Sequence, residues 1–216
     1  IPTPNPRVYG LSDYNNSDMT GQRGHHTKGR SMTKMQKSVC VYCGSRDGGK
    51  PAYAQAAADV GDMLAHNHWR LVYGAGDVGL MGRVARATQD AGGTTFGVIP
   101  THLLDWEVGK RDLDTFIITE TMHERKKVML MNADAVVILP GGAGSLDELF
   151  EALTWRQLGL HSKPIFALNT NGFWTPLLGL IDHFITEGFA DASLRGFVQV
   201  ADDVPALTSG LRAALS

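Results

Sequence analysis

The sequence has few cysteines, no long apolar run and little excess of charge of either sign. Cys40 and Cys43 are its only cysteines, too few for a disulfide framework, so a reduced, cytoplasmic protein is the default interpretation. No apolar run reaches the length of a membrane-spanning helix. We expect no signal peptide, because the N-terminus lacks an apolar core. The net charge is −2 without a long basic stripe, which disfavours binding along a nucleic acid backbone.

The first 35 residues differ in composition from the rest of the chain. They are rich in Pro, Asn, Ser, Gly, Thr, Arg and Lys and have almost no periodic apolar pattern. Such a segment buries too little apolar surface to fold, so we expect a flexible tail over 1–35. Met32 and Met35 are both candidates for the biological start. Residues 36–216 are long enough for a single domain with a substantial core.

From Lys37 onward, apolar runs of strand length alternate with amphipathic segments of helix length. The runs are nearly continuous in apolar residues, as in parallel strands buried on both faces. The pattern predicts an α/β, Rossmann-like, doubly wound, mainly parallel sheet of about seven strands with helices on both faces. We expect the strands at 38–43, 70–73, 95–99, 115–118, 135–139, 164–168 and 197–200. We expect the helices at about 51–67, 78–91, 121–132, 145–158, 174–187 and 203–215.

The loops that follow the predicted strands locate the ligand site, because open parallel sheets bind ligands beyond the carboxyl ends of their strands. Two of the four loops considered are rich in glycine, which turns alone do not readily explain. The loops are Gly44-Ser45-Arg46, Gly74-Ala75-Gly76-Asp77, Pro100-Thr101-His102 and Pro140-Gly141-Gly142-Ala143-Gly144-Ser145.

The strongest local signal is P-G-G-A-G-S-L-D-E at 140–148. It follows an apolar strand and opens an amphipathic helix. Backbone N–H groups of the glycine loop and the helix start, together with the helix dipole, form a site for an anion. The Ser145 hydroxyl adds a donor. The alternative is a tight strand–helix turn in which Ser145 to Glu148 form a capping box. The pattern favours the phosphate role.

Gly74, Gly76 and Gly79 fit the dinucleotide-binding pattern G-x-G-x-x-G. That pattern also needs an acid at the end of the next strand, to bind the ribose hydroxyls. The next strand ends Gly97-Val98-Ile99-Pro100, so a dinucleotide is disfavoured. Close backbone approach to a smaller ligand and close helix–strand packing remain as alternatives.

Three charged residues lie near the predicted ligand edge. The Arg125 guanidinium can bind a phosphate or a ribose hydroxyl, although the basic run around it slightly favours a solvated helix face. Glu148 is placed to stabilise an oxocarbenium-like centre and to orient or deprotonate water, unless it caps its helix. Glu107 follows Pro100, and its plainer interpretation is an exposed loop acid.

Cys40 and Cys43 form a C-x-x-C motif that we interpret as buried strand residues. Residues three apart in a strand point to opposite faces. No second pair of zinc ligands follows, and a redox pair needs a helix directly after the strand. No histidine spacing in the chain predicts a metal site.

Together these motifs resemble the "lonely guy" family of cytokinin riboside 5′-monophosphate phosphoribohydrolases, which is often mislabelled lysine decarboxylase. The family marks are P-G-G-x-G-T-x-x-E and an R-K pair after Met-His. They correspond here to 140–148 and to Met122-His123-Glu124-Arg125-Lys126. Further matches lie at 41–45, 72–82 and 154–159. The resemblance spans about residues 37–200.

The resemblance implies hydrolysis of the N-glycosidic bond of AMP or an N6-substituted AMP, releasing the free base and ribose 5-phosphate. It implies that Arg125 and Glu148 are catalytic, that the enzyme is a homodimer with its site near the interface, and that it needs no metal or organic cofactor. The loops and the resemblance together give the expected substrate-binding residues: Gly44, Ser45, Gly74, Gly76, Glu107, Met122, Lys126, Gly141, Gly142, Ala143, Gly144, Ser145 and Thr154.

The chain departs from the family pattern at four positions. Ser145 replaces the usual Thr and keeps the hydroxyl, whereas Ala143 replaces a residue that is often Tyr. Arg46 and Asp47 stand where small residues are common. These departures bear on the choice of base more than on the reaction, so plain AMP stands beside a prenylated nucleotide as a candidate substrate.

Three other functions compete with hydrolysis. A non-catalytic carrier of a nucleotide or of molybdenum cofactor would use the same glycine loop without needing the Arg125–Glu148 pair. A pyridoxal-phosphate lysine decarboxylase lacks a persuasive Schiff-base lysine in this short chain. A dinucleotide oxidoreductase lacks the acid for the ribose.

Overall fold

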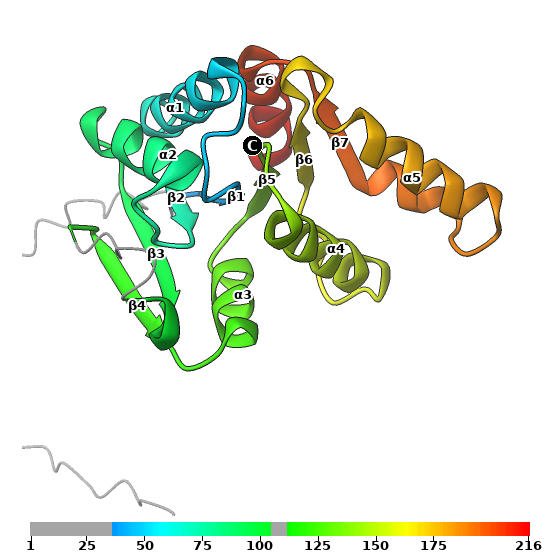
Figure 1. Cartoon of the computed structure of the whole chain (residues 1–216), viewed down its shortest axis with the longest axis horizontal. Coiled ribbons are helices and arrows are strands. Elements are labelled where there is room, and N and C mark those ends of the chain that lie inside the picture. Colours follow the sequence, from blue (N-terminus) through cyan, green and yellow to red (C-terminus); the bar gives the residue numbers. More distant parts are fainter. Residues whose placement is uncertain (1–35, 105–111) are drawn as a thin grey trace, which may run out of the picture. The chain divides into compact units, whose positions relative to one another are not determined.

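The computed structural model describes residues 36–104 and 112–216. Within these residues, seven parallel strands form one sheet, flanked by helices (Figure 1). The strand order is β4-β3-β2-β1-β5-β6-β7, and every neighbouring pair is parallel. The predicted fold class is therefore confirmed. The expected tail, 1–35, and the loop acid Glu107 lie outside the described residues.

The strands and helices lie close to the predicted ranges. The strands are β1 (Ser38–Tyr42), β2 (Arg70–Tyr73), β3 (Thr95–Pro100), β4 (Thr115–Thr119), β5 (Ala135–Ile138), β6 (Ile165–Leu168) and β7 (Val198–Ala201). The α-helices are α1 (Pro51–His66), α2 (Gly79–Asp90), α3 (Met122–Met131), α4 (Ala143–Gln157), α5 (Thr175–Thr186) and α6 (Val204–Leu215). Short 3-10 helices lie at Thr101–Leu103, Thr170–Gly172 and Ala192–Phe197. Across the described ranges, no helix combines the length and apolar character that crossing a membrane requires.

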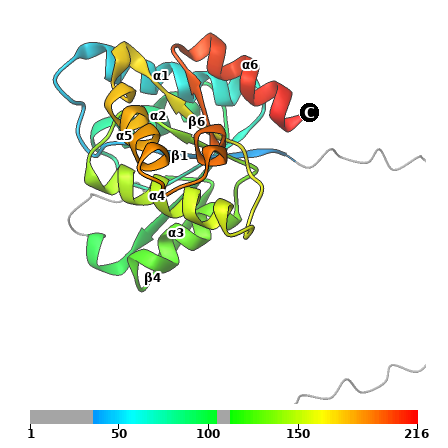
Figure 2. The same ribbon diagram turned by 90° about the vertical axis from the view of Figure 1, so that its right-hand side faces the viewer.

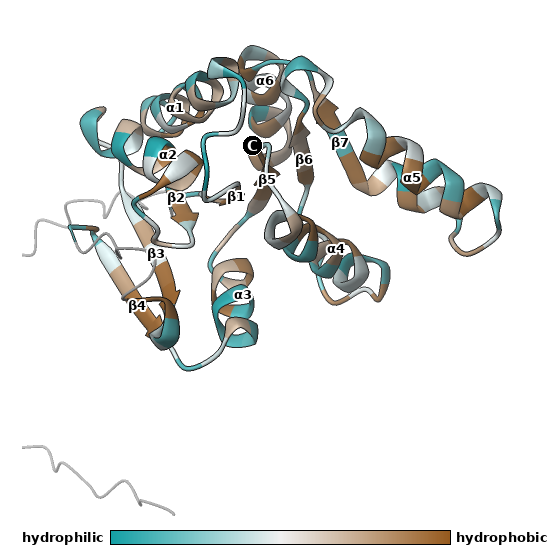
Figure 3. Cartoon of the chain, viewed as in Figure 1, coloured by the Kyte–Doolittle hydropathy of each residue, from teal (hydrophilic) through white to brown (hydrophobic). Residues whose placement is uncertain are grey.

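Both faces of the sheet are apolar, because each face carries a layer of helices. Along β1, Val39 and Val41 join a core with α1, α2 and α6, whereas Cys40 and Tyr42 join a core with α3, α4 and α5. Figure 2 shows α1 and α6 on one side of the strands and α3 and α4 on the other. The strands are accordingly largely hydrophobic in Figure 3. Cys43 belongs to the opposite core from Cys40, as the alternation of strand residues predicts.

Several helices begin where the local sequence supplies a cap. Pro51 opens α1 in its first turn, as predicted, because proline is suited to a position without a helical N–H partner. At α3, the Thr121 hydroxyl accepts from the Glu124 backbone N–H, and the Glu124 carboxylate accepts from the Thr121 N–H. The Asp203 carboxylate caps α6. These caps fix the ends of the loops that precede the helices.

The loop after β1 is held against α2 by a close backbone contact. Gly79 opens α2 with a φ of +56°, a conformation that favours glycine. A Cβ at Gly79 would collide with the backbone of Ser45 and Arg46. Beside it, the Leu80 N–H donates to the Gly44 carbonyl over 3.1 Å. Gly79 therefore serves close packing of two loops at the ligand edge.

We expect Gly79→Ala to lower the free energy of unfolding by at least about 1–2 kcal/mol, because alanine disfavours a left-handed backbone and its methyl group meets the neighbouring loop. Urea denaturation followed by circular dichroism measures the change. Gly179→Ala is the matched control: it lies inside α5 with open space around its Cβ position, so alanine should leave stability unchanged or raise it by up to about 1 kcal/mol. Equal effects of the two substitutions would contradict the strain argument.

Candidate active site

A cavity of about 580 Å³ lies at the carboxyl edge of the sheet, chiefly between the loops that follow β1 and β5. These strands are neighbours, but α1 and α4, which follow them, cover opposite faces of the sheet. Such a switch point leaves a crevice at the strand ends, where doubly wound folds bind ligands. The cavity therefore lies where the fold predicts a site.

The glycine loop and the start of α4 form one wall of the cavity. Gly142 is the N-cap of α4, and the exposed Gly142, Ala143 and Gly144 line the space. The first N–H groups of a helix have no partner within the helix, so they are available to an anion. The Ser145 side chain is buried and also lines the cavity. This wall has the chemistry of a phosphate site.

The capping-box alternative for Ser145 and Glu148 is wrong. Helix α4 begins at Ala143, before the predicted start at 145, and its N-cap makes no side-chain hydrogen bond. Ser145 is therefore inside the first turn, and Glu148 lies on the second turn rather than the first. Ala143 and Gly144 already belong to the helix, whereas the N-cap Gly142 is extended, so the helix begins within the glycine loop. The Glu148 carboxylate is consequently not an N-terminal cap of α4.

Arg125 is buried at the base of the cavity, with 4% of its surface exposed. Its Nη2 donates to the Gly74 carbonyl over 2.9 Å, and its Nη1 lies 3.8 Å from the Met122 sulfur. A Cβ at Gly74 would collide with the guanidinium. The interpretation of Arg125 as part of a solvated helix face is therefore wrong. Gly74 acts by making room for the arginine and does not line the cavity.

Glu148 is partly buried and lines the cavity with Arg125. Its negative charge reaches the end of β1, where Cys43 also lines the space. Burial raises the pKa of the Cys43 thiol well above its usual range, and the charge of Glu148 raises that pKa further. The cavity thus brings a buried guanidinium and a carboxylate to the same end of the glycine wall.

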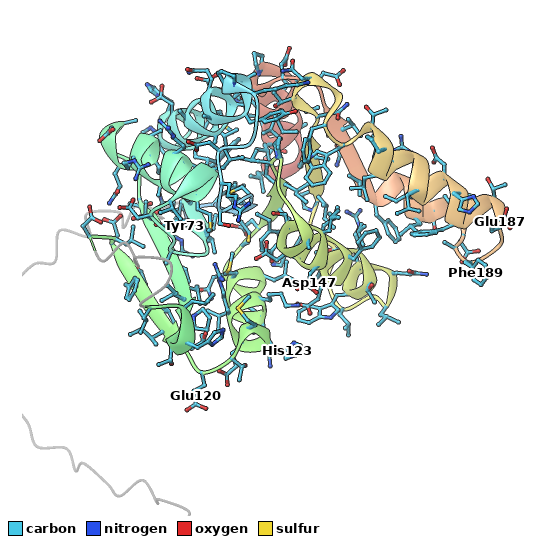
Figure 4. The ribbon with its side chains drawn as sticks, in the orientation of Figure 1. Tyr73, Glu120, His123, Asp147, Glu187 and Phe189 are labelled. Atoms are coloured by element: carbon cyan, nitrogen blue, oxygen red, sulfur yellow. The ribbon has the colours of Figure 1, made fainter. Side chains whose placement is uncertain are left out.

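Lys126 turns away from the cavity. Its ammonium group is 2.9 Å from the Asp147 carboxylate and 2.8 Å from the Glu151 carboxylate, and its side chain is 5% exposed. Burial alone would lower the pKa of Lys126, but hydrogen bonds and charges from Glu151 and Asp147 outweigh it and raise the pKa. Figure 4 shows Asp147 on α4, the helix that this ion pair joins to α3.

The structure brings most of the expected residues together and separates the others. Gly74, Gly76, Lys126 and Thr154 do not line the cavity; Thr154 is exposed on α4. Glu107 lies outside the described residues. The expected residues that line the cavity are Gly44, Ser45, Met122, Arg125, Gly141, Gly142, Ala143, Gly144, Ser145 and Glu148.

The cavity also has an apolar wall that sequence reasoning missed. Tyr53 and Phe173 pack edge to face, with ring centroids 5.5 Å apart. Tyr53 lies in the first turn of α1, directly after a loop already expected at the ligand edge, so its position gave a usable signal. Phe173 follows β6, whose loop carries no motif. The lining residues that were not expected are Cys43, Arg46, Asp47, Gly48, Gly49, Tyr53, Leu80, Met81, Leu103, Pro140 and Phe173.

The described lining residues offer no lysine to form a Schiff base. Among the described residues, no three His, Cys, Asp or Glu side chains come together as candidate metal ligands. The chemical groups at the cavity are instead backbone N–H donors, hydroxyls, the Arg125 guanidinium and the Glu148 carboxylate. They suit a phosphorylated substrate whose reacting centre gains positive charge.

Comparison with known proteins identifies the family. Residues 81–211 match the family model described as "Possible lysine decarboxylase". "Probable cytokinin riboside 5'-monophosphate phosphoribohydrolase LOG4" of Oryza sativa subsp. japonica is 43% identical over 175 residues, which cover 81% of this chain and 76% of that protein. The chain belongs to the cytokinin riboside 5′-monophosphate phosphoribohydrolase family. Another family member, "Cytokinin riboside 5'-monophosphate phosphoribohydrolase LOG3" of Arabidopsis thaliana, is 40% identical over 185 residues, with coverage of 85% and 86%. The resemblance to this family is thereby confirmed.

The family shares its fold with proteins of other names. The molybdenum cofactor carrier protein from Chlamydomonas reinhardtii superposes with a TM-score of 0.65 over 83% of this chain and 98% of that chain. The two sequences are 22% identical. At this identity the likeness shows the fold alone, and function has to be argued from the residues of the site.

We expect Cys40 and Cys43 to resist alkylation by iodoacetamide at pH 8 in the native protein. Burial keeps both thiols protonated, and the thiolate is the reactive form. Mass spectrometry after a short exposure should find neither residue labelled, whereas urea-unfolded chain should be labelled at both. Ser209→Cys, on the exposed side of α6, is the positive control and should be labelled in the native state. Rapid native labelling of Cys43 would show that its thiol is ionised and accessible.

Proposed function

We propose that this chain hydrolyses the N-glycosidic bond of AMP or of an N6-substituted AMP, releasing the free base and ribose 5-phosphate. The observation that carries the proposal is that Arg125 and Glu148 line the same cavity as the glycine wall at the start of α4. A phosphate-binding wall without an acid would serve binding alone. Membership of the phosphoribohydrolase family supports the same reaction.

The 5′-phosphate binds at the N-terminus of α4. Backbone N–H groups of the first turn and the Ser145 hydroxyl donate to its oxygens, and the helix dipole favours its negative charge. The phosphate then acts as an anchor that directs the ribose along the cavity. Glu148 and Arg125, from α4 and α3, lie on the cavity wall to meet it. Anchoring a remote group in this way lowers the entropic barrier to reaction at C1′.

Glu148 supports the chemistry at C1′. As the bond from C1′ to the base nitrogen breaks, its electron pair leaves with the base and C1′ gains oxocarbenium character. The carboxylate stabilises that positive charge and takes a proton from the attacking water, whose oxygen bonds to C1′. That proton is then available to the departing base. Arg125, fixed by the Gly74 carbonyl, donates to phosphate or ribose oxygens.

We expect purified protein to release base from AMP and from isopentenyladenosine 5′-monophosphate, and Glu148→Gln to lower kcat at least about 100-fold, because the amide neither carries charge nor accepts the proton. Chromatography of the free base measures both rates. Glu187→Gln is the matched control, since Glu187 ends α5 and does not line the cavity (Figure 4). It should keep the wild-type rate, and the ratio of the two substrate rates gives the base preference.

Failure of the wild-type protein to release base from either nucleotide would contradict the proposed hydrolysis. L-lysine with added pyridoxal phosphate is a second substrate test, prompted by the description of the family model. We expect no cadaverine, because none of the described residues that line the cavity is a lysine. Cadaverine formation would overturn the proposal in favour of decarboxylation.

We also propose that the protein is a homodimer, with its site near the subunit interface, and that it is cytoplasmic. An apolar patch that we call the α3–α4 patch, formed by Met131, Trp155, Leu158 and Leu160, supports the dimer. Met131 is 69% exposed, and Leu158 and Leu160 are each 68% exposed. Met131, Trp155 and Leu160 line a common hollow, and exposed apolar surface of this kind is typical of a protein contact. The two buried free cysteines are consistent with a reducing compartment.

We expect light scattering to give a mass twice the 23.4 kDa of this chain, and Leu160→Glu to halve it, because a charge would be buried without a partner. Phe189→Glu is the control: Phe189 is exposed beyond the end of α5, outside the α3–α4 patch (Figure 4). Its substitution should leave the mass unchanged. A wild-type monomer would contradict the dimer, and a dimer that survives Leu160→Glu would place the interface elsewhere.

A further inference from the structure

The loop after β1 brings two neighbouring charged residues, Arg46 and Asp47, to the cavity, but only Asp47 forms an ion pair with a described residue. Arg46 is exposed, lines the cavity and forms no ion pair with a described residue. The Asp47 carboxylate is paired with Arg83 of α2, whose Nη2 and Nε lie 3.0 Å and 3.4 Å from its two oxygens. The carboxylate that would otherwise neutralise Arg46 is therefore engaged from the other side. The loop leaves a positive charge facing the cavity.

The backbone that carries Arg46 is fixed on both sides. Strand β1 lies between β2 and β5 in the sheet, so its loop passes between the starts of α2 and α4. On the α4 side, the Gly44 N–H donates to the Pro140 carbonyl over 3.0 Å. On the α2 side, Gly79 packs directly against the backbone of Ser45 and Arg46. These backbone contacts fix the position from which the Arg46 side chain extends, beside the glycine wall.

The charges around the cavity favour a role for Arg46 toward an anion. Among the described lining residues, Asp47 is paired with Arg83, which does not itself line the cavity. Arg125 and Glu148 line the cavity with opposite charges. A bound 5′-phosphate adds about −1.5 to −2 at pH 7. The start of α4 contributes roughly half a positive charge. Arg46 adds a second, exposed guanidinium to the cavity lining beside the buried Arg125.

We propose that Arg46 binds the phosphate of the substrate and so sets the preference for a nucleotide over a nucleoside. The inference rests on the proposed function for the identity of the substrate. The guanidinium fork donates two parallel hydrogen bonds to phosphate oxygens from the side opposite the α4 backbone. The same guanidinium stacked on the purine base is the alternative outcome that the experiment separates.

The test is calorimetric binding of ribose 5-phosphate and, separately, of adenine to the full chain. We expect Arg46→Gln to weaken the binding of ribose 5-phosphate about tenfold, in keeping with the loss of one solvated charge-assisted contact. The affinity for adenine should stay unchanged. Arg46→Lys keeps the positive charge but not the forked guanidinium, so it should lose less affinity for ribose 5-phosphate than Arg46→Gln. Binding to Arg46→Gln should also depend less on salt. Lys50→Gln, the matched control from the end of the same loop, lies outside this cavity and should stay within about twofold of wild type.

Steady-state kinetics with AMP gives a second readout. If Arg46 binds the phosphate equally in substrate and transition state, Arg46→Gln raises KM about tenfold and leaves kcat within about twofold. Unchanged ribose 5-phosphate affinity in Arg46→Gln overturns the inference, and so does a loss confined to adenine, which would assign the side chain to the base. Wild-type protein that binds no ribose 5-phosphate overturns it as well. Arg46-dependent binding without base release from AMP supports the inference while overturning the proposed hydrolysis.

Discussion

The site depends on the close approach of two loops at the centre of the sheet. Strands β1 and β5 are neighbours, but the chain continues from them to helices on opposite faces of the sheet. The two loops therefore diverge, and they must still close the bottom of the crevice. One hydrogen bond, from the Gly44 N–H to the Pro140 carbonyl, joins them. The two backbones approach so closely that a Cβ on Gly44 would lie 3.3 Å from the Gly141 Cα, and a Cβ on Gly141 would lie 3.0 Å from the Gly44 nitrogen. The glycines at this edge therefore serve the geometry of the crevice as well as any ligand.

Two adjacent basic residues of α3 have different roles, one in the candidate site and one in holding the helices together. Arg125 faces the cavity and is held by a carbonyl of β2's loop, whereas Lys126 is held by two carboxylates of α4. Groups this buried would be unfavourable without such partners. The bonds of the two residues tie α3 to both sides of the switch point. Glu148 and Arg125 consequently keep a defined relation although they lie on different helices.

Much of the fold was predictable from the sequence, and part of the site was not. Continuous apolar runs identified buried parallel strands, and the order of loops identified the ligand edge. The burial of Arg125 could not be predicted, because a run of basic residues does not show that one of them packs against Gly74, in a distant loop. Lys126 was expected at the substrate from the family resemblance, and its sequence context does not show that Asp147 and Glu151 of α4 form ion pairs with it. Phe173 was missed because its contact with Tyr53 joins segments that share no local pattern.

The central position of β1 has a consequence for the order of synthesis. Among the described strands it is the first to be synthesised, and it pairs with β2, the next one. Its other edge pairs with β5, through contacts such as Val39 with Ala135, which are far apart in sequence. Until the chain has been made past Ile138, that edge has unpaired backbone groups open to other chains. During synthesis the chain thus passes through a stage in which β1 is paired on one edge only, and neither the crevice nor the centre of the sheet exists.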